Sequence, residues 1–292
     1  MARQARRPRL ARVSRWREDL SRLWRDKAMT TLAHLTDLHL DHWPANLDAA
    51  MDLLAGTDPD VILIGGDNGN DDGLRRTVEA LGRAWPEADI AWVMGNHDLW
   101  RKPYRHLWSR FSDITATYLE GGNLETDSCT VVGTYGHYDY RGGLATIPLE
   151  RYETFTDGRH VWNDRFIDRL GRTNPQIAAE IAELFWHRYQ AAVARGLPIV
   201  VLSHTWPFAP TDDRSRSFFD AYGSNQLIGD AILAAKLRPA VLFCGHTHRA
   251  DRWEEFGFPM INTGSDYSEV KVTIWDLERG TIPGASSAGH EP

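Results

Sequence analysis

Five short clusters of histidine, aspartate and asparagine contain the residues of this sequence that could carry out chemistry. Each cluster follows a short apolar run, at the point where a predicted strand ends. The clusters are Asp37-Leu38-His39, Gly66-Asp67-Asn68, Gly95-Asn96-His97-Asp98, Ser203-His204 and Gly245-His246-Thr247-His248. Ligands of α/β proteins bind beyond the carboxyl ends of strands, so five such ends can converge on one site. We therefore expect these side chains to lie together.

The residue types in the clusters indicate a metal site. Imidazole and carboxylate groups without thiolate suit divalent ions such as Mn, Fe, Zn or Ni. Seven ligand-type residues are more than a single tetrahedral site needs. They match two divalent metal ions that share a carboxylate and a water, an arrangement that activates a hydroxide and holds phosphoryl oxygens. The clusters therefore predict metal-dependent hydrolysis of a phosphate ester.

Alternating strand-like and helix-like segments must position these clusters. Short apolar runs rich in β-branched residues occur at 31–36, 61–65, 90–94, 130–134, 198–203, 240–244 and 270–275. Helix-like stretches occur at 44–55, 73–84, 103–111, 175–194 and 225–236. Pro59, Pro198 and Pro239 precede strands, and Gly196 follows the longest helix. This alternation predicts an α/β domain whose helices cover its sheets.

Three segments depart from the alternation and set the predicted domain boundaries. Residues 1–28 form a basic, amphipathic N-terminal extension with a net charge of +7, which leaves −14 for the rest of the chain. Residues 99–172 are rich in aromatic residues and turn formers, and we interpret them as an insert over the core of a domain at 29–279. Residues 280–292 are predicted to be a disordered tail.

The order of the five clusters resembles the motifs of the calcineurin-like metallophosphoesterase superfamily. That family has Asp-x-His, Gly-Asp, Gly-Asn-His-Asp, a histidine after an apolar strand, and Gly-His-x-His in this order. The run Asn262-Thr263-Gly264-Ser265 is similar to the turn that often follows the last motif. Each motif alone is weak, but together they span residues 37–265 and are specific. The resemblance implies a four-layer αββα sandwich of two mixed β-sheets flanked by helices.

The resemblance also implies a role for each residue of the clusters. The ligands of the first metal would be Asp37, His39 and His248. The ligands of the second metal would be Asn96, His204 and His246. Asp67 would bridge both ions, and the hydroxide between the ions would be the nucleophile. His97 is similar to the family's outer-sphere histidine, which protonates the leaving oxygen or stabilises the transition state, and Asp98 would orient the His97 imidazole.

Aromatic residues of the insert are the candidates for substrate selection. The run Tyr135-Gly136-His137-Tyr138-Asp139-Tyr140 follows a strand, where many bacterial family members carry an aromatic-Asp-Tyr loop near the metals. Such rings can stack on a planar group, or they can simply pack the insert against the core. We select His137 and Tyr138 as candidate residues of the substrate pocket.

Composition and charge limit the partners of the protein. No apolar run approaches the length of a transmembrane helix, and no secretory signal is recognisable. Cys129 and Cys244 are interpreted as buried thiols of a cytoplasmic protein. The acidic charge after residue 28 disfavours nucleic acid. The N-terminal segment could contact a membrane surface or nucleic-acid phosphates, but an extension without a role in the core reaction is the favoured interpretation.

The sequence thus predicts a cytoplasmic phosphoesterase that acts on a small phosphodiester or phosphomonoester, with no obligate protein partner. Two alternatives remain open. One is a nuclease of the same superfamily, for which a long basic groove would be expected. The other is a non-catalytic interaction scaffold with the same fold, whose expected mark is the loss of metal ligands.

Overall fold

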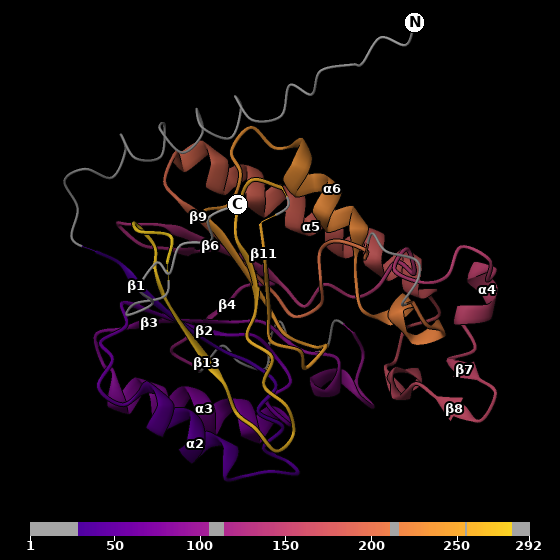
Figure 1. Cartoon of the computed structure of the whole chain (residues 1–292), viewed down its shortest axis with the longest axis horizontal. Coiled ribbons are helices and arrows are strands. Elements are labelled where there is room, and N and C mark those ends of the chain that lie inside the picture. The colour runs from indigo at the N-terminus through magenta and orange to yellow at the C-terminus, as the bar shows by residue number, and fades with distance from the viewer. Residues whose placement is uncertain (1–28, 105–113, 211–215, 255, 282–292) are drawn as a thin grey trace, which may run out of the picture.

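The apolar runs of the sequence form the strands of two mixed β-sheets in the computed structural model, which describes residues 29–104, 114–210, 216–254 and 256–281. Helices α2 (Asn46–Leu54) and α3 (Asp71–Ala84) cover the outer face of one sheet (Figure 1). Helices α5 (Asn174–Arg195) and α6 (Gln226–Ala234) cover the outer face of the other (Figure 1). The predicted four-layer αββα sandwich is confirmed.

The first sheet has the strand order β13-β1-β2-β3-β4. Its parallel strands are β1 (Thr31–Leu35), β2 (Val61–Ile64), β3 (Asp89–Trp92) and β4 (Thr117–Tyr118). Strand β13 (Val272–Asp276) pairs antiparallel with β1 at the edge. The carboxyl ends of β1, β2 and β3 therefore lie at the same rim of the sheet.

The second sheet has the strand order β11-β12-β10-β9-β6-β5. Its parallel strands are β6 (Thr130–Thr134), β9 (Ile199–Ser203), β10 (Val241–Cys244) and β12 (Met260–Asn262). The edge strands β5 (Leu124–Glu125) and β11 (Asp251–Trp253) are antiparallel. All seven predicted strands form, whereas β4, β5, β11 and β12, each two or three residues long, were not predicted.

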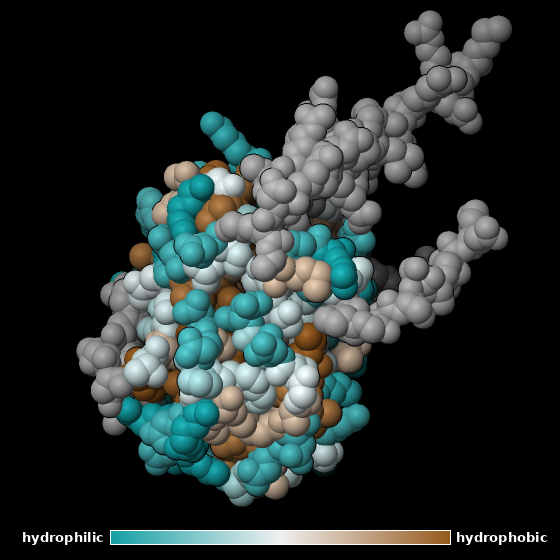
Figure 2. Space-filling view, turned by 90° about the vertical axis from the view of Figure 1, so that its left-hand side faces the viewer, coloured by the Kyte–Doolittle hydropathy of each residue, from teal (hydrophilic) through white to brown (hydrophobic). Residues whose placement is uncertain are grey.

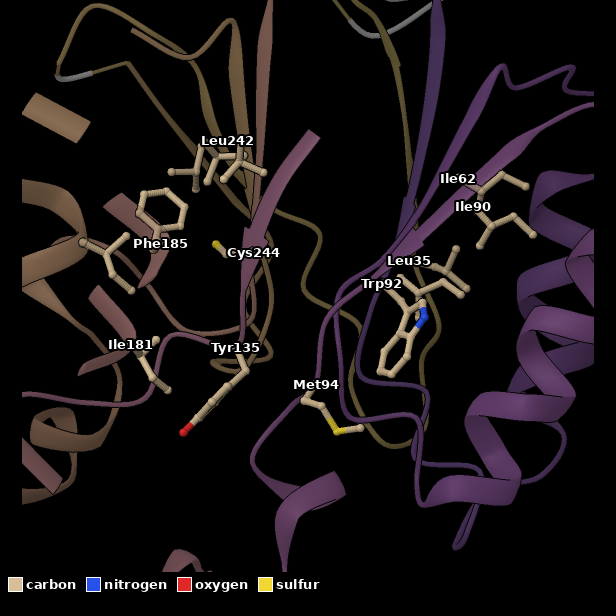
Figure 3. Packing of buried hydrophobic residues seen from close by; sticks show 14 of the residues in the cluster. Leu35, Ile62, Ile90, Trp92, Met94, Tyr135, Ile181, Phe185, Leu242 and Cys244 are labelled. Carbon is tan, nitrogen blue, oxygen red and sulfur yellow. The ribbon is translucent and has the colours of Figure 1, made fainter. Parts of the chain in front are cut away.

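Alternation of side chains along the strands divides the core into layers. Leu32, Val61 and Leu63 belong to the cluster between the sheets, together with Val200 and Phe243 of the second sheet. The alternate residues face the helices: Figure 3 shows Leu35, Ile62 and Ile90 on the side of the first sheet, and Ile181, Phe185 and Leu242 on the side of the second. Since both faces are covered, most residues of the central strands are apolar.

Local signals set the helix boundaries, and the predicted end of the longest helix at Gly196 is one of them. Asn70 caps α3 by accepting a hydrogen bond from the Gly73 amide at 2.9 Å. Thr173 and Gln176 form a capping box at the start of α5, and Gly196 ends that helix with a φ of 69°. The predicted helix at 103–111 falls almost entirely outside the described residues, as do the extension at 1–28 and most of the tail.

The insert has a small core of its own. Strands β4, β5 and β6 of the two sheets fall within the predicted insert at 99–172, and the other regular elements of this region are short: η1 (His97–Leu99), α4 (Leu149–Tyr152), β7 (Thr156–Asp157), β8 (His160–Val161) and η2 (Asn163–Phe166). Helix α4 and the loops on either side of it pack against η4 (Phe218–Tyr222) through buried aromatic residues that include Tyr138, Tyr140, Tyr152, Phe155, Phe218 and Tyr222. In Figure 1, α4, β7 and β8 lie at the far right, beyond the sheets.

Polar groups outside the clusters take structural places. His34 is buried between the sheets and its Nδ1 lies 2.6 Å from Thr263 Oγ1, whereas His160 and His187 are exposed. His106 lies outside the described residues. Cys129 and Cys244 are buried free thiols, as predicted.

The outer surface is mixed in character. The face shown in Figure 2 carries hydrophilic residues interspersed with small hydrophobic areas. Large exposed hydrophobic side chains such as Leu53, Leu149 and Leu170 come from separate elements. Within the described part of the chain, no helix is both long enough and apolar enough to cross a membrane.

Candidate metal centre and active site

The loops after five strands, three from one sheet and two from the other, are hydrogen-bonded to one another at one rim of the sandwich. The His39 amide donates to Asp67 O at 2.9 Å, which joins the loops after β1 and β2. The ring Nδ1 of His204, after β9, lies 2.8 Å from Gly65 O. The Gly245 amide, after β10, donates to His204 O at 3.1 Å. The predicted convergence of strand ends therefore occurs across both sheets.

One group of ligand-type side chains consists of Asp37, His39 and His248, whose ligand atoms all lie within 4.8 Å of one another. His248 Nε2 is 3.6 Å from Asp37 Oδ1. Asp37 and His39 are fully buried, and the His248 side chain is 18% exposed. These are the three residues predicted for the first metal.

A second group lies on the other side of Asp67. Asn96 Oδ1 is 2.9 Å from both His204 Nε2 and His246 Nδ1. Asp67 Oδ2 is 3.4 Å from His204 Nε2 and 4.0 Å from His39 Nε2, so it faces both groups. The structure thus brings together all seven predicted ligand residues.

The backbone at these positions is unusual. Ten described residues other than glycine have a positive φ, and five of them are predicted metal ligands: Asp37, His39, Asp67, His246 and His248. Such conformations cost free energy and persist only where the surroundings enforce them, which is typical of functional sites. Neighbouring glycines leave the room required, because a Cβ on Gly95 would collide with Asp67 Oδ1.

Three of the histidines use one ring nitrogen for a hydrogen bond to an oxygen outside the ligand cluster. His204 Nδ1 donates to Gly65 O, and His246 Nε2 donates to Tyr222 O at 3.1 Å. His248 Nδ1 donates to Asp266 Oδ1 at 3.2 Å. In each ring the other nitrogen faces the cluster, as in histidines that bind metals.

His39 supplies a further indication that the donor set fits a cation. Both of its ring nitrogens are buried and have no hydrogen-bond partner among the described residues. A buried polar group without a partner is costly, and a divalent ion would satisfy it. The combination of buried carboxylates with imidazoles suits a divalent metal.

The electrostatics of the site favour positive charge. Burial opposes the charged form of His204, but Asp67 and Asp37 outweigh it and raise the pKa of His204 to about 10. Burial would likewise raise the pKa of Asp67, yet the facing histidines hold it well below its usual range. Burial lowers the pKa of His246 to about 3, which keeps that ring neutral and able to act as a ligand.

His97 and Asp98 take different places. His97 Nε2 lies 4.0 Å from Asp67 Oδ2, and its ring stacks on Trp100 with centroids 3.8 Å apart. Asp98 accepts hydrogen bonds from the amides of Asn68 and Gly95, at 3.1 and 2.9 Å. Asp98 was predicted to orient the His97 ring, but the hydrogen bonds that its carboxylate makes among the described residues join the loops after β2 and β3 and do not include His97.

A cavity of about 270 Å³ opens above the metal-ligand cluster. Its lining combines site residues with two aromatic walls and consists of Asp67, Asn96, His97, Trp162, His246, His248, Asp266 and Tyr267. Tyr267 follows β12 and its ring centroid lies 4.6 Å from that of His39, whereas Trp162 comes from the insert.

His137 and Tyr138, which we selected for the pocket, do not line this cavity. Both are about 1% exposed, and their rings stack with centroids 4.3 Å apart. His137 Nε2 is hydrogen-bonded to Asn174 Oδ1 of α5 at 2.9 Å. These residues therefore pack the insert against the core, the alternative left open for the aromatic run.

Sequence reasoning missed the cavity residues Trp162, Asp266 and Tyr267, and it also missed Asp164. Asp164 lies in η2 of the insert, is 1% exposed, and accepts a hydrogen bond from Asn96 Nδ2 at 2.8 Å. Trp100, Tyr138 and Trp162 also donate to it. The one signal for it in the sequence, an aspartate two residues after a tryptophan, is too common to be informative.

Comparison with models of protein families identifies the family of the chain. Residues 30–250, more than half of the sequence, match the model described as calcineurin-like phosphoesterase. The chain belongs to this family, and the resemblance seen in its motifs is confirmed. Among curated proteins, no significant match is found.

Solved structures with a similar fold include other proteins of this architecture. The phosphopantetheinyl hydrolase PptH from Mycobacterium tuberculosis is 20% identical with a TM-score of 0.63, covering 84% of this chain and 96% of that one. The protein TT1561 of Thermus thermophilus is 13% identical with a TM-score of 0.56, covering 87% and 97%. At such identities the similarity supports the fold alone.

Proposed function

We propose that this protein is a binuclear metal-dependent phosphoesterase that hydrolyses small phosphodiesters. The observation that carries the proposal is the orientation of the imidazole rings of His204, His246 and His248. In each ring one nitrogen donates a hydrogen bond to an oxygen of Gly65, Tyr222 or Asp266, and the other nitrogen faces the ligand cluster. A scaffold that had lost metal binding would have no need of this arrangement.

The two groups of side chains suggest how two ions would be held. Asp37, His39 and His248 would hold one, and Asn96, His204 and His246 the other. Asp67 would bridge them, because it faces both groups. Mn, Fe, Zn and Ni all suit this donor set. When bound, such ions would supply an activated hydroxide and neutralise charge on the phosphoryl oxygens.

His97 is the proposed general acid. Its side chain is 18% exposed and lines the cavity, so a leaving oxygen can approach it. Stacking on Trp100 limits the orientations of the ring. A positioned imidazole of this kind can protonate an alkoxide as it leaves.

The cavity favours a compact diester. Its lining among the described residues includes no lysine or arginine that could neutralise the second charge of a phosphomonoester. Trp162 and Tyr267 offer apolar faces for an organic group. A volume of about 270 Å³ suits a small ligand better than a nucleic-acid strand.

A substrate panel with added Mn²⁺ tests this proposal. Bis-aryl phosphate, aryl phosphate, a phosphopantetheinyl diester and single-stranded DNA would be compared by kcat/KM, the third because PptH, which shares the fold, is named a phosphopantetheinyl hydrolase. We expect close to two metal ions per chain and the highest kcat/KM with a diester. Metal-free protein under metal-replete conditions would refute the binuclear site, and preference for the monoester would refute the diester assignment. Rapid DNA degradation would favour the nuclease.

A further inference from the structure

Asp164 lies where the insert meets the candidate metal centre. Four side chains donate hydrogen bonds to its buried carboxylate. Oδ1 accepts from Asn96 Nδ2 at 2.8 Å and from Trp100 Nε1 at 2.7 Å. Oδ2 accepts from Trp162 Nε1 at 2.6 Å and from Tyr138 Oη at 3.1 Å. Every partner is a donor, so the position requires a group that only accepts.

A carboxylate meets this requirement and an amide does not. An ionised carboxylate offers about four acceptor sites, two on each oxygen, and here all of them are used. Asparagine has nearly the same shape but would turn an N–H group toward two of the donors. Buried donors left without an acceptor are destabilising, so the surrounding side chains would have to reorient.

The consequence reaches the cluster through Asn96. Because Asp164 accepts from Nδ2, the amide must present Oδ1 on its opposite side. That oxygen lies 2.9 Å from His204 Nε2 and from His246 Nδ1. Without Asp164 the amide is free to rotate and present N–H groups, which cannot bind a metal.

The same carboxylate also holds a wall of the cavity. The Trp162 indole donates to Asp164, and its ring lies parallel to Tyr222 with centroids 5.3 Å apart. Asp164 thus links Trp162, which lines the cavity, to Asn96, which faces the candidate metal ligands His204 and His246. Asn96 and Asp164 are 68 positions apart in the sequence.

We infer that Asp164 is a positioning residue that fixes the amide of Asn96 for metal binding and couples it to the Trp162 wall of the substrate cavity. The inference rests on the proposed function, in which Asn96 is a ligand. It assigns to the insert a part in the metal centre as well as in substrate selection.

A double-mutant cycle tests whether Asp164 acts through Asn96. Mn²⁺ affinity would be measured by calorimetry for Asp164→Asn, Asn96→Ala and the double variant. We expect Asp164→Asn to weaken binding by about 10–100-fold. In the Asn96→Ala background the same substitution should have less than about a twofold effect, because the residue through which it acts is gone. Asp157→Asn, an exposed position of the insert, is the matched control. Additive losses would overturn the inference.

A second readout needs no metal. In the NMR spectrum of metal-free protein, the side-chain amide signals of Asn96 should shift in Asp164→Asn and stay in place in Asp157→Asn. Unmoved signals would overturn the inference whether or not the protein binds Mn²⁺. A shift in a protein that never binds Mn²⁺ would instead overturn the proposed function and leave the contact established. If Asp164→Asn does not fold, Asp164→Glu, which keeps an acceptor-only carboxylate, should give a smaller loss with the same lack of additivity.

Discussion

The strand-end loops and the insert both line the cavity, but they differ in how they are supported. The loops extend two sheets that are buried on both faces, and they are hydrogen-bonded across the sandwich, as between His204 and Gly65. The insert has short elements and packs around its own aromatic core. The insert contributes Trp162 and Asp164 to the site, and both residues lie at the start of η2. The difference suggests that the sheets supply the metal ligands, whereas the insert supplies a wall of the cavity and, through Asp164, a hydrogen bond to one of those ligands.

The largest effect on metal content and activity is expected from a substitution in the strand-end loops, at Asp67. Asp67→Ala removes the carboxylate that faces both groups of ligands. Because that carboxylate would serve both ions, the variant should lose both and show only background hydrolysis. Elemental analysis and the diester assay would measure the two losses. Asp72→Ala, at an exposed position five residues later, should keep both properties. Retention of two metals by Asp67→Ala would rule out a bridging role.

The seven ligand-type residues could be predicted because each follows a strand within a few residues. The parallel order of the strands then brings their ends together, as the hydrogen bond between His39 and Asp67 shows. Local sequence therefore contains most of the information needed for this part of the site. The same holds for the sandwich itself, whose seven main strands were predicted from apolar runs.

The insert could not be predicted in this way. Its strands β7 and β8 have two residues each and α4 has four, which is too short for a periodic pattern. Asp164 gains its role from Asn96 and Trp100, which are distant in sequence. The two residues selected from the aromatic run, His137 and Tyr138, do not line the cavity, because nothing in the local sequence shows that α5 supplies Asn174 as the partner of a buried His137.

An intermediate effect is expected at the boundary between the two regions. His97→Ala should retain metal but lower kcat by about 10²–10⁴-fold if the ring protonates the leaving group. The loss should shrink for aryl leaving groups, which depart without a proton. Comparing alkyl and aryl diesters measures this dependence, with the exposed His160→Ala as control. An equal loss for both classes would argue for electrostatic assistance alone.

A smaller effect is expected in the insert. Trp162→Ala removes one aromatic wall of the cavity, so kcat/KM for an aryl diester should fall by about tenfold, mainly through KM, while metal content is kept. Trp162→Phe retains a ring and should recover much of the loss. An equally large loss in both variants, accompanied by loss of metal, would mean that Trp162 acts on the metal ligands and not only as a wall of the cavity.

The smallest effect concerns how the insert is anchored to α5. His137 is buried beside Asn174, and burial lowers the pKa of His137 from 6.5 to about 3. The folded protein thus resists protonation that the unfolded chain accepts. The contribution of His137 to stability is complete above pH 6.5 and is lost as the pH falls toward 3. Between pH 7.5 and 6.0 this lowers the free energy of unfolding by about 0.8 kcal/mol.

The variant His137→Asn isolates that contribution, since asparagine tolerates the positive φ of 29° at this position. It should be less stable than the parent protein at pH 7.5, because it packs less well and alters the bond to Asn174. The difference in free energy of unfolding between the parent protein and the variant should be smaller by about 0.8 kcal/mol at pH 6.0. Only the parent protein has a ring at this position that must stay neutral when the protein folds. Urea unfolding of both proteins at the two pH values measures the change. Parallel stability curves would show that His137 titrates alike in the folded and unfolded states, and that the insert does not hold this ring away from water.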